Sequence, residues 1–260
     1  MASLDDIFSI ANRRTVITGG TAGIGFAVAA HFVSAGAEVV ITGRRAEGRQ
    51  IAGSIGARFV SMDVRSDTSV ERGLNEAVDI LGGLDVLVLN AGVSLPAGPL
   101  EELDLAAFRE VFDVNLFGVI RGIRFGLPHM QRGGVVLATS SPGGRQAIAV
   151  PGVLAYSASK AALDMVVRAA GLELAGKGIR VTGVLPGIIR TQLASDDGPD
   201  VSWLARLTAT GEERDPADMA PVFHFLASDA GAMLQGSVVA ADDGCTAGLS
   251  ASVLVRLVGE

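Results

Sequence analysis

The stretch TVITGGTAGIGFAVAAHF, residues 15–32, decides the fold of this chain. A short β-branched run passes through a glycine-rich loop into an alanine-rich segment with helical spacing, which indicates a buried strand followed by a helix. The loop glycines Gly19, Gly23 and Gly25 permit a tight turn and let backbone N–H groups and the helix N-terminus approach a pyrophosphate. Their G-x-x-x-G-x-G spacing differs from G-x-G-x-x-G, and in a chain with 34 glycines a plain strand–helix turn is the alternative interpretation.

Runs of the same kind recur along the whole chain. They are nearly continuous in hydrophobic residues and are separated by segments with helical spacing, which is typical of a parallel sheet covered on both faces. The pattern predicts a single doubly wound α/β domain over residues 1–260, with a seven-stranded parallel sheet and helices on both faces. A polar stretch at 191–216 is long for a connection and is predicted to be a substrate loop. The predicted strands are residues 15–20, 37–43, 57–64, 84–92, 134–141, 179–187 and 236–244.

The composition excludes several classes of function. A net charge of −7 argues against nucleic acid or an anionic membrane as a partner. The lone cysteine, Cys245, cannot form an internal disulfide, and two aspartates stand near the N-terminus where a signal peptide carries positive charge, so we expect a cytoplasmic protein. The three histidines, His31, His129 and His224, have no metal-ligand spacing, so we expect packing or surface roles for them and no metal site.

The second predicted strand ends in ITGRR, residues 41–45. A carboxylate in this region would bind the ribose 2′-hydroxyl of NAD, whereas an arginine accommodates the 2′-phosphate of NADP. The chain has Arg44 and Arg45 here, and a guanidinium can pair with a phosphate through two hydrogen bonds. We therefore predict NADP(H) rather than NAD(H) as the cofactor, with a solvated helix start as the alternative role of the two arginines.

The stretch LAYSASKAALD, residues 154–164, contains the single tyrosine of the chain, Tyr156, and one of its two lysines, Lys160. Residues four apart lie on the same face of a helix. A free phenol has a pKa of about 10 and is a poor acid or base at neutral pH, but a nearby ammonium favours the phenolate. The pair therefore predicts a proton donor and acceptor. The alternative is an exposed lysine beside a packed tyrosine.

With these residues assembled, the chain from about residue 10 to 249 resembles the short-chain dehydrogenase/reductase family. The resemblance implies a Rossmann-type fold and hydride transfer between a nicotinamide and a ketone, an aldehyde or a secondary alcohol. It rests on seven motifs in the family's order: TGGTAGIG (18–25), DV (63–64), NAG (90–92), VNL (114–116), SS (140–141), YSASK (156–160) and PGIIRT (186–191).

The resemblance implies a catalytic tetrad of Asn115, Ser141, Tyr156 and Lys160. Tyr156 would exchange a proton with the substrate oxygen, and Ser141 would polarise that oxygen. Lys160 would hold the nicotinamide ribose and lower the pKa of the phenol, while Asn115 would kink its helix and fix a water. A hydroxyl and a phenol aimed at one oxygen stabilise the charge that develops there during hydride transfer, which agrees with these roles.

The resemblance also implies a cofactor site along the carboxyl ends of the strands. The DV motif would frame the adenine, the NAG motif would line the cleft, and the PGIIRT motif would hold the carboxamide. The complete set of expected cofactor residues is Gly19, Thr21, Gly23, Ile24, Gly25, Arg44, Arg45, Asp63, Val64, Asn90, Ala91, Gly92, Tyr156, Lys160, Pro186, Gly187, Ile189 and Thr191.

Two departures from the family pattern affect this assignment. Ser141 lies fifteen residues before Tyr156, where the family has about thirteen. We interpret the intervening loop as longer by two residues and retain Ser141, with Ser140 as the alternative. Near the C-terminus, AADDGCTAG (240–248) places Asp243 at a position where relatives often have glycine, which affects the packing there.

The predicted substrate is a small, moderately hydrophobic carbonyl or alcohol compound, because the residues expected around it are mostly apolar. Arg145 and Arg190 lie where they would reach an anionic substituent. The pocket prediction comprises Val93, Ser94, Pro142, Arg145, Gln146, Pro151, Gly187, Leu193 and Trp203, the last either closing over substrate or anchoring its loop.

Two other functions are compatible with the pattern: a catalytically idle dinucleotide-binding sensor or scaffold, and a lyase or isomerase that uses the same tyrosine without net redox change. The family resemblance also implies a homotetramer, or a homodimer, through the helices around 102–126 and 154–176. The apolar tail 249–260 would extend such an interface.

Overall fold

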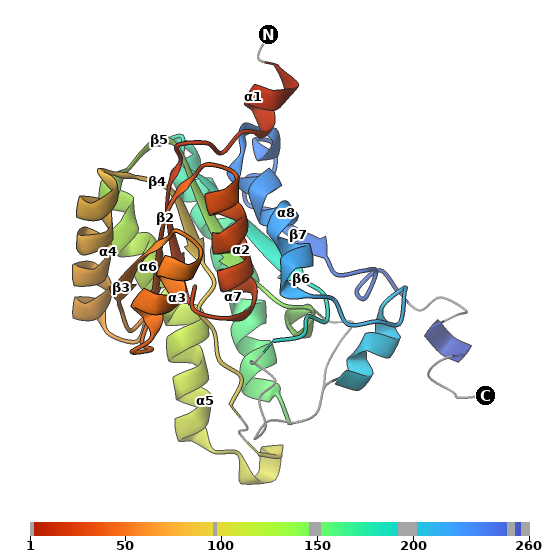
Figure 1. Cartoon of the computed structure of the whole chain (residues 1–260). Coiled ribbons are helices and arrows are strands. Elements are labelled where there is room, and N and C mark those ends of the chain that lie inside the picture. Colours follow the sequence, from red (N-terminus) through yellow and green to blue (C-terminus); the bar gives the residue numbers. More distant parts are fainter. Residues whose placement is uncertain (1–2, 96–97, 146–151, 192–201, 249–252, 256–260) are drawn as a thin grey trace.

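The computed structural model describes residues 3–95, 98–145, 152–191, 202–248 and 253–255 (Figure 1). Seven strands form one parallel sheet in the order β3-β2-β1-β4-β5-β6-β7, which confirms the predicted fold class. The strands are β1 Arg14–Thr18, β2 Glu38–Gly43, β3 Arg58–Ser61, β4 Leu84–Leu89, β5 Met130–Thr139, β6 Arg180–Pro186 and β7 Val238–Ala241. Each lies at a predicted run, and β5 begins four residues earlier than predicted.

Helices cover both faces of the sheet, as predicted, because successive strand side chains point to opposite sides. Val16 packs into a core with α4, α6 and α7, whereas the next residue, Ile17, packs into a second core with α2, α3 and α8. The helices are α1 Leu4–Phe8, α2 Gly23–Ser34, α3 Gly48–Ser54, α4 Asp67–Leu81, α5 Leu105–Phe112, α6 Gly118–Gly126, α7 Leu154–Ala175 and α8 Pro216–Ala227. None of the helices in the described ranges is long and apolar enough to cross a membrane.

The order of the strands in the sheet indicates where a ligand would bind. The chain runs outward from β1 through β2 to β3 and then returns to the other side of β1 with β4. In parallel sheets, ligands bind in the crevice that opens at such a reversal, beyond the carboxyl ends of the strands. The loops that follow β1, β4 and β5 therefore meet at one edge, and these loops carry the sequence motifs.

Asp243 stands where relatives often have glycine, and its backbone is in the left-handed region, with φ 51°. Asp tolerates this conformation better than most residues because its side chain can form local hydrogen bonds. Here the carboxylate accepts a hydrogen bond from Thr210 Oγ1 and another from Arg214 Nη2 at 3.4 Å. The departure from glycine is thus accommodated by contacts that tie the end of β7 to the segment before α8.

Two of the histidines meet although they are far apart in sequence. His31 on α2 and His224 on α8 share a hydrogen bond of 3.0 Å between ring nitrogens, and His224 Nε2 lies 2.8 Å from the Phe8 carbonyl oxygen. Burial lowers the pKa of His31, and the neighbouring His224 lowers it further. The pair has a packing role, as expected, but the sequence contained no sign that the two rings would touch.

Candidate active site

The glycine loop between β1 and α2 can present its backbone directly to a ligand, because no side chains stand at its glycine positions. Gly19 has φ 67°, and a Cβ on it would lie 2.8 Å from the Ala91 Cα atom. A Cβ on Gly25 would overlap the Gly19 carbonyl oxygen and lie 2.5 Å from Asn90 Nδ2. Any side chain at these positions would therefore displace the loop that follows β4 or the turn at Gly19. This close packing keeps the backbone at the N-terminus of α2 open toward a ligand and fits a pyrophosphate, which stays a prediction.

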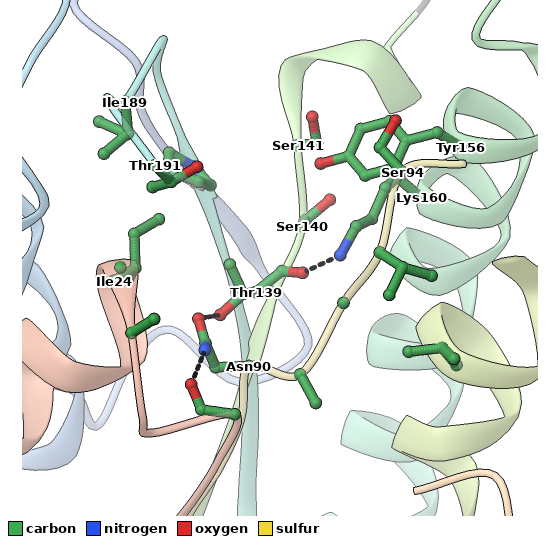
Figure 2. Close-up of a pocket in the computed structure, with 18 of the residues that line it drawn as sticks. Ile24, Asn90, Ser94, Thr139, Ser140, Ser141, Tyr156, Lys160, Ile189 and Thr191 are labelled. Carbon is green, nitrogen blue, oxygen red and sulfur yellow. Dashed lines mark hydrogen bonds between the residues drawn. The ribbon is translucent and has the colours of Figure 1, made fainter. Parts of the chain in front are cut away.

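A cavity of about 730 Å³ opens at this edge of the sheet. It extends from the end of β2 past the glycine loop to the N-terminal part of α7, and Figure 2 shows the part of it around Asn90, Lys160 and Tyr156. Every expected cofactor residue except Gly25 lines it, and Ser141 does so too. Gly25 packs against the Gly19 carbonyl and Asn90 and does not line the cavity, and neither does Asn115, which is fully buried. The lining residues from the cofactor prediction are Gly19, Thr21, Gly23, Ile24, Arg44, Arg45, Asp63, Val64, Asn90, Ala91, Gly92, Tyr156, Lys160, Pro186, Gly187, Ile189 and Thr191.

Asn90 joins three strand ends at the floor of the cavity. Its Nδ2 donates to the carbonyl oxygens of Thr18 and Gly19, each at 3.3 Å, and its Oδ1 accepts a hydrogen bond from Thr139 Oγ1 at 3.2 Å (Figure 2). Both ends of the amide are therefore engaged by protein groups from β1, the loop that follows it, and β5. These bonds fix the shape of the cleft at this point.

Tyr156 and Ser141 meet at the opposite side of the cavity (Figure 2). Burial raises the pKa of the Tyr156 phenol, and a hydrogen bond with the Ser141 hydroxyl lowers it. Burial has the larger effect, so the phenol is protonated at neutral pH. A protonated phenol beside a second hydroxyl is suited to donate a proton to an oxygen that gains negative charge.

Lys160 lies one turn further along α7 and is almost completely buried, with 4% of its surface exposed. Its Nζ donates to the Thr139 carbonyl oxygen at 2.7 Å and lies 5.7 Å from the centre of the Tyr156 ring (Figure 2). Burial lowers the pKa of Lys160 from 10.5 to about 8, and the charge of Asp164 opposes this effect. The alternative of an exposed lysine is wrong.

The pKa of the Tyr156 phenol is raised in this structure although Lys160 lies beside it, so the expected effect of Lys160 on that pKa stays a prediction. Desolvation of the phenol outweighs the favourable contributions, and the hydrogen bond that lowers the pKa comes from Ser141. The reason is that the same burial which brings Lys160 to Tyr156 removes both groups from water, and desolvation disfavours the phenolate.

The structure distinguishes the two adjacent serines. The Ser140 hydroxyl is buried and donates to Asp164 Oδ1 at 2.5 Å, which is away from the phenol. The Ser141 hydroxyl accepts a hydrogen bond from the Gly143 N–H at 3.2 Å and reaches Tyr156. Both serines line the cavity, but the Ser141 hydroxyl bonds with the phenol whereas the Ser140 hydroxyl is held by Asp164, so these contacts favour Ser141.

Asn115 lies in a π-helical turn, Asp113–Phe117, that interrupts the helix between α5 and α6. Single π-turns often occur at functional sites because the extra residue redirects a side chain. Asn115 Oδ1 accepts a hydrogen bond from the Val93 N–H at 2.8 Å, and its Nδ2 donates to the Val93 carbonyl at 2.9 Å and to Ser159 Oγ at 3.1 Å. The irregular helix that the resemblance implied is therefore present, and Asn115 links the loop after β4 to α7.

The opposite end of the cavity is positively charged. Arg44 and Arg45 follow β2, are exposed, and line the cavity. Asp63 lies nearby, but its carboxylate is held by Arg65 through contacts of 2.8–3.1 Å, which keeps the pKa of that carboxyl below its usual range. The Asp63 carboxylate is thus already paired with a third arginine, Arg65.

The reactive end of the cavity is mainly apolar, as predicted. Val93, Ser94, Pro142 and Gly187 line it. The lining residues that the sequence prediction missed include Leu95, Gly143, Val153, Ser157, Ile188 and Leu204. Ser157 follows Tyr156 on α7, whereas the other five lie in loops or short turns whose positions depend on the tertiary fold, so periodicity could not have found them. Gln146, Pro151, Leu193 and most of the first half of the 191–216 loop lie outside the described residues.

Both arginines expected at an anionic substrate group are engaged elsewhere. Arg145 Nε lies 3.1 Å from Asp164 Oδ2, and Arg190 pairs with Asp215 at 2.9 Å and with Glu213 at 3.6 Å. Neither is among the residues that line the cavity. The expectation that they meet a substrate anion is therefore wrong, since each guanidinium is compensated by its own carboxylates.

Trp203 is 46% exposed and does not line the cavity, whereas its neighbour Leu204 does. Of the two roles considered for Trp203, closure over the substrate therefore has no support in the described residues.

Comparison with known proteins identifies the family. The model described as Enoyl-(Acyl carrier protein) reductase matches residues 19–246. A cis-4-hydroxycyclohexanecarboxylate dehydrogenase of Sinomonas cyclohexanicum is 37% identical over 248 residues, which cover 92% of this chain and 98% of the relative. This chain belongs to the short-chain dehydrogenase/reductase family. The family membership inferred from the seven motifs is thereby confirmed.

Two further relatives of this dehydrogenase/reductase bear on its cofactor. An NADP-dependent (R)-specific alcohol dehydrogenase of Lentilactobacillus kefiri is 36% identical over 90% of this chain and 97% of the relative. A short-chain dehydrogenase of Burkholderia cenocepacia J2315, solved in complex with NADP, superposes with a TM-score of 0.84 at 29% identity, covering 91% of this chain and 99% of that structure. The chain is an NAD(P)(H)-dependent oxidoreductase that acts on alcohol and carbonyl groups.

Proposed function

We propose that this short-chain dehydrogenase/reductase is an NADP(H)-preferring enzyme that reduces a ketone or aldehyde, or oxidises the corresponding alcohol, with Tyr156 as the proton donor and acceptor. One observation carries the proposal. Tyr156, Ser141 and Lys160 line one end of the same cavity that the glycine loop lines further along. The bound nicotinamide would supply or accept the hydride. All proton handling falls to the residues of the chain.

In the reduction direction, the Tyr156 phenol gives its proton to the substrate oxygen as negative charge develops there. Its raised pKa keeps that proton in place at neutral pH. The Ser141 hydroxyl, fixed by the Gly143 N–H, offers a second hydrogen bond to the same oxygen. Two donors aimed at one atom both polarise the carbonyl group and orient it, so turnover depends on each of them.

Lys160 supports the phenol from the next turn of α7. Its ammonium lies between the Thr139 carbonyl and the cavity, where it would also hold the ribose hydroxyls of the cofactor. Positive charge at this place favours the phenolate that remains after the proton has left. Asn115 fixes Val93 and Ser159 on either side of this group and so keeps the loop after β4 in register with α7.

The preference for NADP(H) is supported by Arg44 and Arg45 at the end of β2 and by the engaged carboxylate of Asp63. Replacing both arginines by alanine should weaken NADPH binding by about ten- to a hundredfold, the contribution of charge-assisted hydrogen bonds, and leave NADH binding nearly unchanged. Fluorescence titration with both nucleotides measures this difference. Equal losses for both nucleotides would assign the arginines to the common part of the cofactor.

The roles of the serines are tested by kinetics with an active ketone. Ser141→Ala should lower kcat by about a hundredfold or more, because one of two donors to the developing charge is lost. Ser140→Ala is the matched control for the adjacent hydroxyl. A larger loss of kcat for Ser140→Ala than for Ser141→Ala would reverse the assignment.

The substrate class is inferred from the lining of the reactive end, which is mainly apolar apart from hydroxyl groups and the buried Lys160. We infer a small, moderately hydrophobic ketone, aldehyde or secondary alcohol. The homotetramer or homodimer, the cytoplasmic location and the substrate loop at 191–216 remain predictions, the first of which sizing chromatography would test.

A further inference from the structure

Asp164 is a buried carboxylate that none of the assigned site residues explains. It lies on α7 one turn beyond Lys160, as Lys160 lies one turn beyond Tyr156, so the three share a face of the helix. Asp164 is only 6% exposed. Because removing a carboxylate from water is costly, such a group is expected only where hydrogen bonds and opposite charge compensate it.

The two oxygens of Asp164 hold opposite ends of one short turn. The 3₁₀ turn Pro142–Gly144 follows Ser141 and carries it at the reactive end of the cavity. Before the turn, Ser140 Oγ donates to Asp164 Oδ1 at 2.5 Å; after it, Arg145 Nε lies 3.1 Å from Asp164 Oδ2. Asp164 thus anchors the residue immediately before Ser141 and the residue that ends the turn.

The turn also packs directly on the helix backbone. A Cβ on Gly144 would lie 2.8 Å from the Ala161 nitrogen and the Lys160 carbonyl carbon, so the turn lies against α7 with no space between. Ser141 is tied to the same turn through the Gly143 N–H. A shift of the turn away from α7 would therefore carry the Ser141 hydroxyl away from the Tyr156 phenol.

We propose that Asp164 is a positioning residue: by binding Ser140 and Arg145 it fixes the Pro142–Gly144 turn against α7 and so holds the Ser141 hydroxyl at Tyr156. The importance of this contact for turnover rests on the proposed function of Ser141 and Tyr156. The contact itself can be measured in the protein alone, without cofactor or substrate.

Tyr156 provides the measurement because it is the only tyrosine of the chain. A stopped-flow jump to a series of alkaline pH values reads the tyrosinate absorbance before the protein unfolds, and so gives the Tyr156 pKa. The Ser141 hydrogen bond lowers that pKa. Ser141→Ala should therefore raise it by about one pH unit, which corresponds to a hydrogen bond of ordinary strength.

The decisive comparison is a double-mutant cycle between Asp164 and Ser141. Asp164→Ala should raise the Tyr156 pKa when Ser141 is present, and this rise should disappear in the Ser141→Ala background. The cycle removes the direct effect of the lost Asp164 charge, because that effect is the same in both backgrounds. An equal change in the two backgrounds, or no change in either, would overturn the proposal.

Asp85→Ala is the matched control. Asp85 also pairs with an arginine, Arg14 at 2.7 Å, but at the amino ends of β1 and β4, far from the turn. Asp85→Ala should therefore leave the Tyr156 pKa unchanged. Should Asp164→Ala fail to fold, Asp164→Asn keeps an oxygen for Ser140 and loses the charge for Arg145, and it should give a smaller rise with the same dependence on Ser141.

Kinetics then separate this inference from the proposed function. With an active ketone, Asp164→Ala should lower kcat as Ser141→Ala does, with a smaller change in KM, because the substrate oxygen loses a donor mainly in the transition state. If the wild-type protein turned over no carbonyl compound, the proposed function would fail while the titration result would stand. If Asp164→Ala changed the Tyr156 pKa equally with and without Ser141 while the wild type turned over ketones, the role of Asp164 would be wrong and the proposed function would stand.

Discussion

The buried ammonium of Lys160 should destabilise the folded protein at neutral pH, and this cost should decrease as the pH rises. The group is 4% exposed, and its pKa is about 8 in the folded protein against 10.5 as the ordinary value. Below about pH 8 both states are protonated and the full cost is present. Between about pH 8 and 10.5 the unfolded chain holds a proton that the folded protein has released, so the free energy of unfolding increases with pH.

The size of the effect follows from the two pKa values. At about 1.4 kcal/mol per pH unit, the difference amounts to about 3 kcal/mol at pH ~7 and falls to about 1.5 kcal/mol at pH ~9.5. Lys160→Met keeps an unbranched side chain of similar length and cannot titrate. The free energy of unfolding of the wild type should therefore rise by about 2 kcal/mol relative to that of the variant over this range.

Urea unfolding followed by circular dichroism at a series of pH values measures both free energies. Lys177→Met is the control, because Lys177 is the other lysine of the chain and is exposed. Its difference from the wild type should stay constant with pH. A constant difference for Lys160→Met as well, or one that changes in the opposite direction, would refute the reasoning that burial depresses the Lys160 pKa.

Three further results are expected. Asp164→Asn should lower the Lys160 pKa further, because Asp164 is the charge that raises it. Around Lys160, Tyr156 lies one turn before it on α7, Arg145 pairs with Asp164, and β5 contributes the neutral Thr139 carbonyl. NMR titration of ¹³C-methylated lysines reads this directly, and an unchanged pKa would contradict it. Gly25→Ala should abolish tight NADPH binding and lower the free energy of unfolding by about 1–3 kcal/mol, since its Cβ would overlap the Gly19 carbonyl. Titration calorimetry measures NADPH binding, and tight binding by this variant would contradict the role of the glycine loop. Raising the pH above about 8 should weaken NADPH binding in the wild type as Lys160 loses its proton, and a Kd that is flat to about pH 9.5 would contradict its role at the ribose.

The fold was predictable from the sequence because its determinants are local and repeated. Near-continuous hydrophobic runs specify doubly covered strands, and the glycine loop after β1 specifies where the first crossover begins. The chemistry was predictable where one helix carries it, since Tyr156 and Lys160 are related by helical geometry alone. Ser141 and Asn115 required the family resemblance, because their approach to α7 depends on contacts across the sheet.

Other features depend on tertiary contacts that no local pattern encodes. The compensation of Arg145 by Asp164 and of Arg190 by Asp215 could not be inferred from spacing, and it reversed the expectation of an anionic substrate group. The net direction of the Tyr156 pKa shift could not be inferred for the same reason. Helical spacing shows that two groups are close, but desolvation depends on how the surrounding loops and β5 bury them.

A comparison of the wild type with Tyr156→Phe tests whether the phenol delivers the proton. NADPH binding is followed by fluorescence, and turnover of a panel of ketones is followed at the nicotinamide absorbance. Removing the phenolic hydroxyl leaves the ring in place and should reduce kcat by about 10²–10⁴-fold while NADPH still binds tightly. Turnover by Tyr156→Phe at the wild-type rate would contradict the account, because another group would then have to deliver the proton.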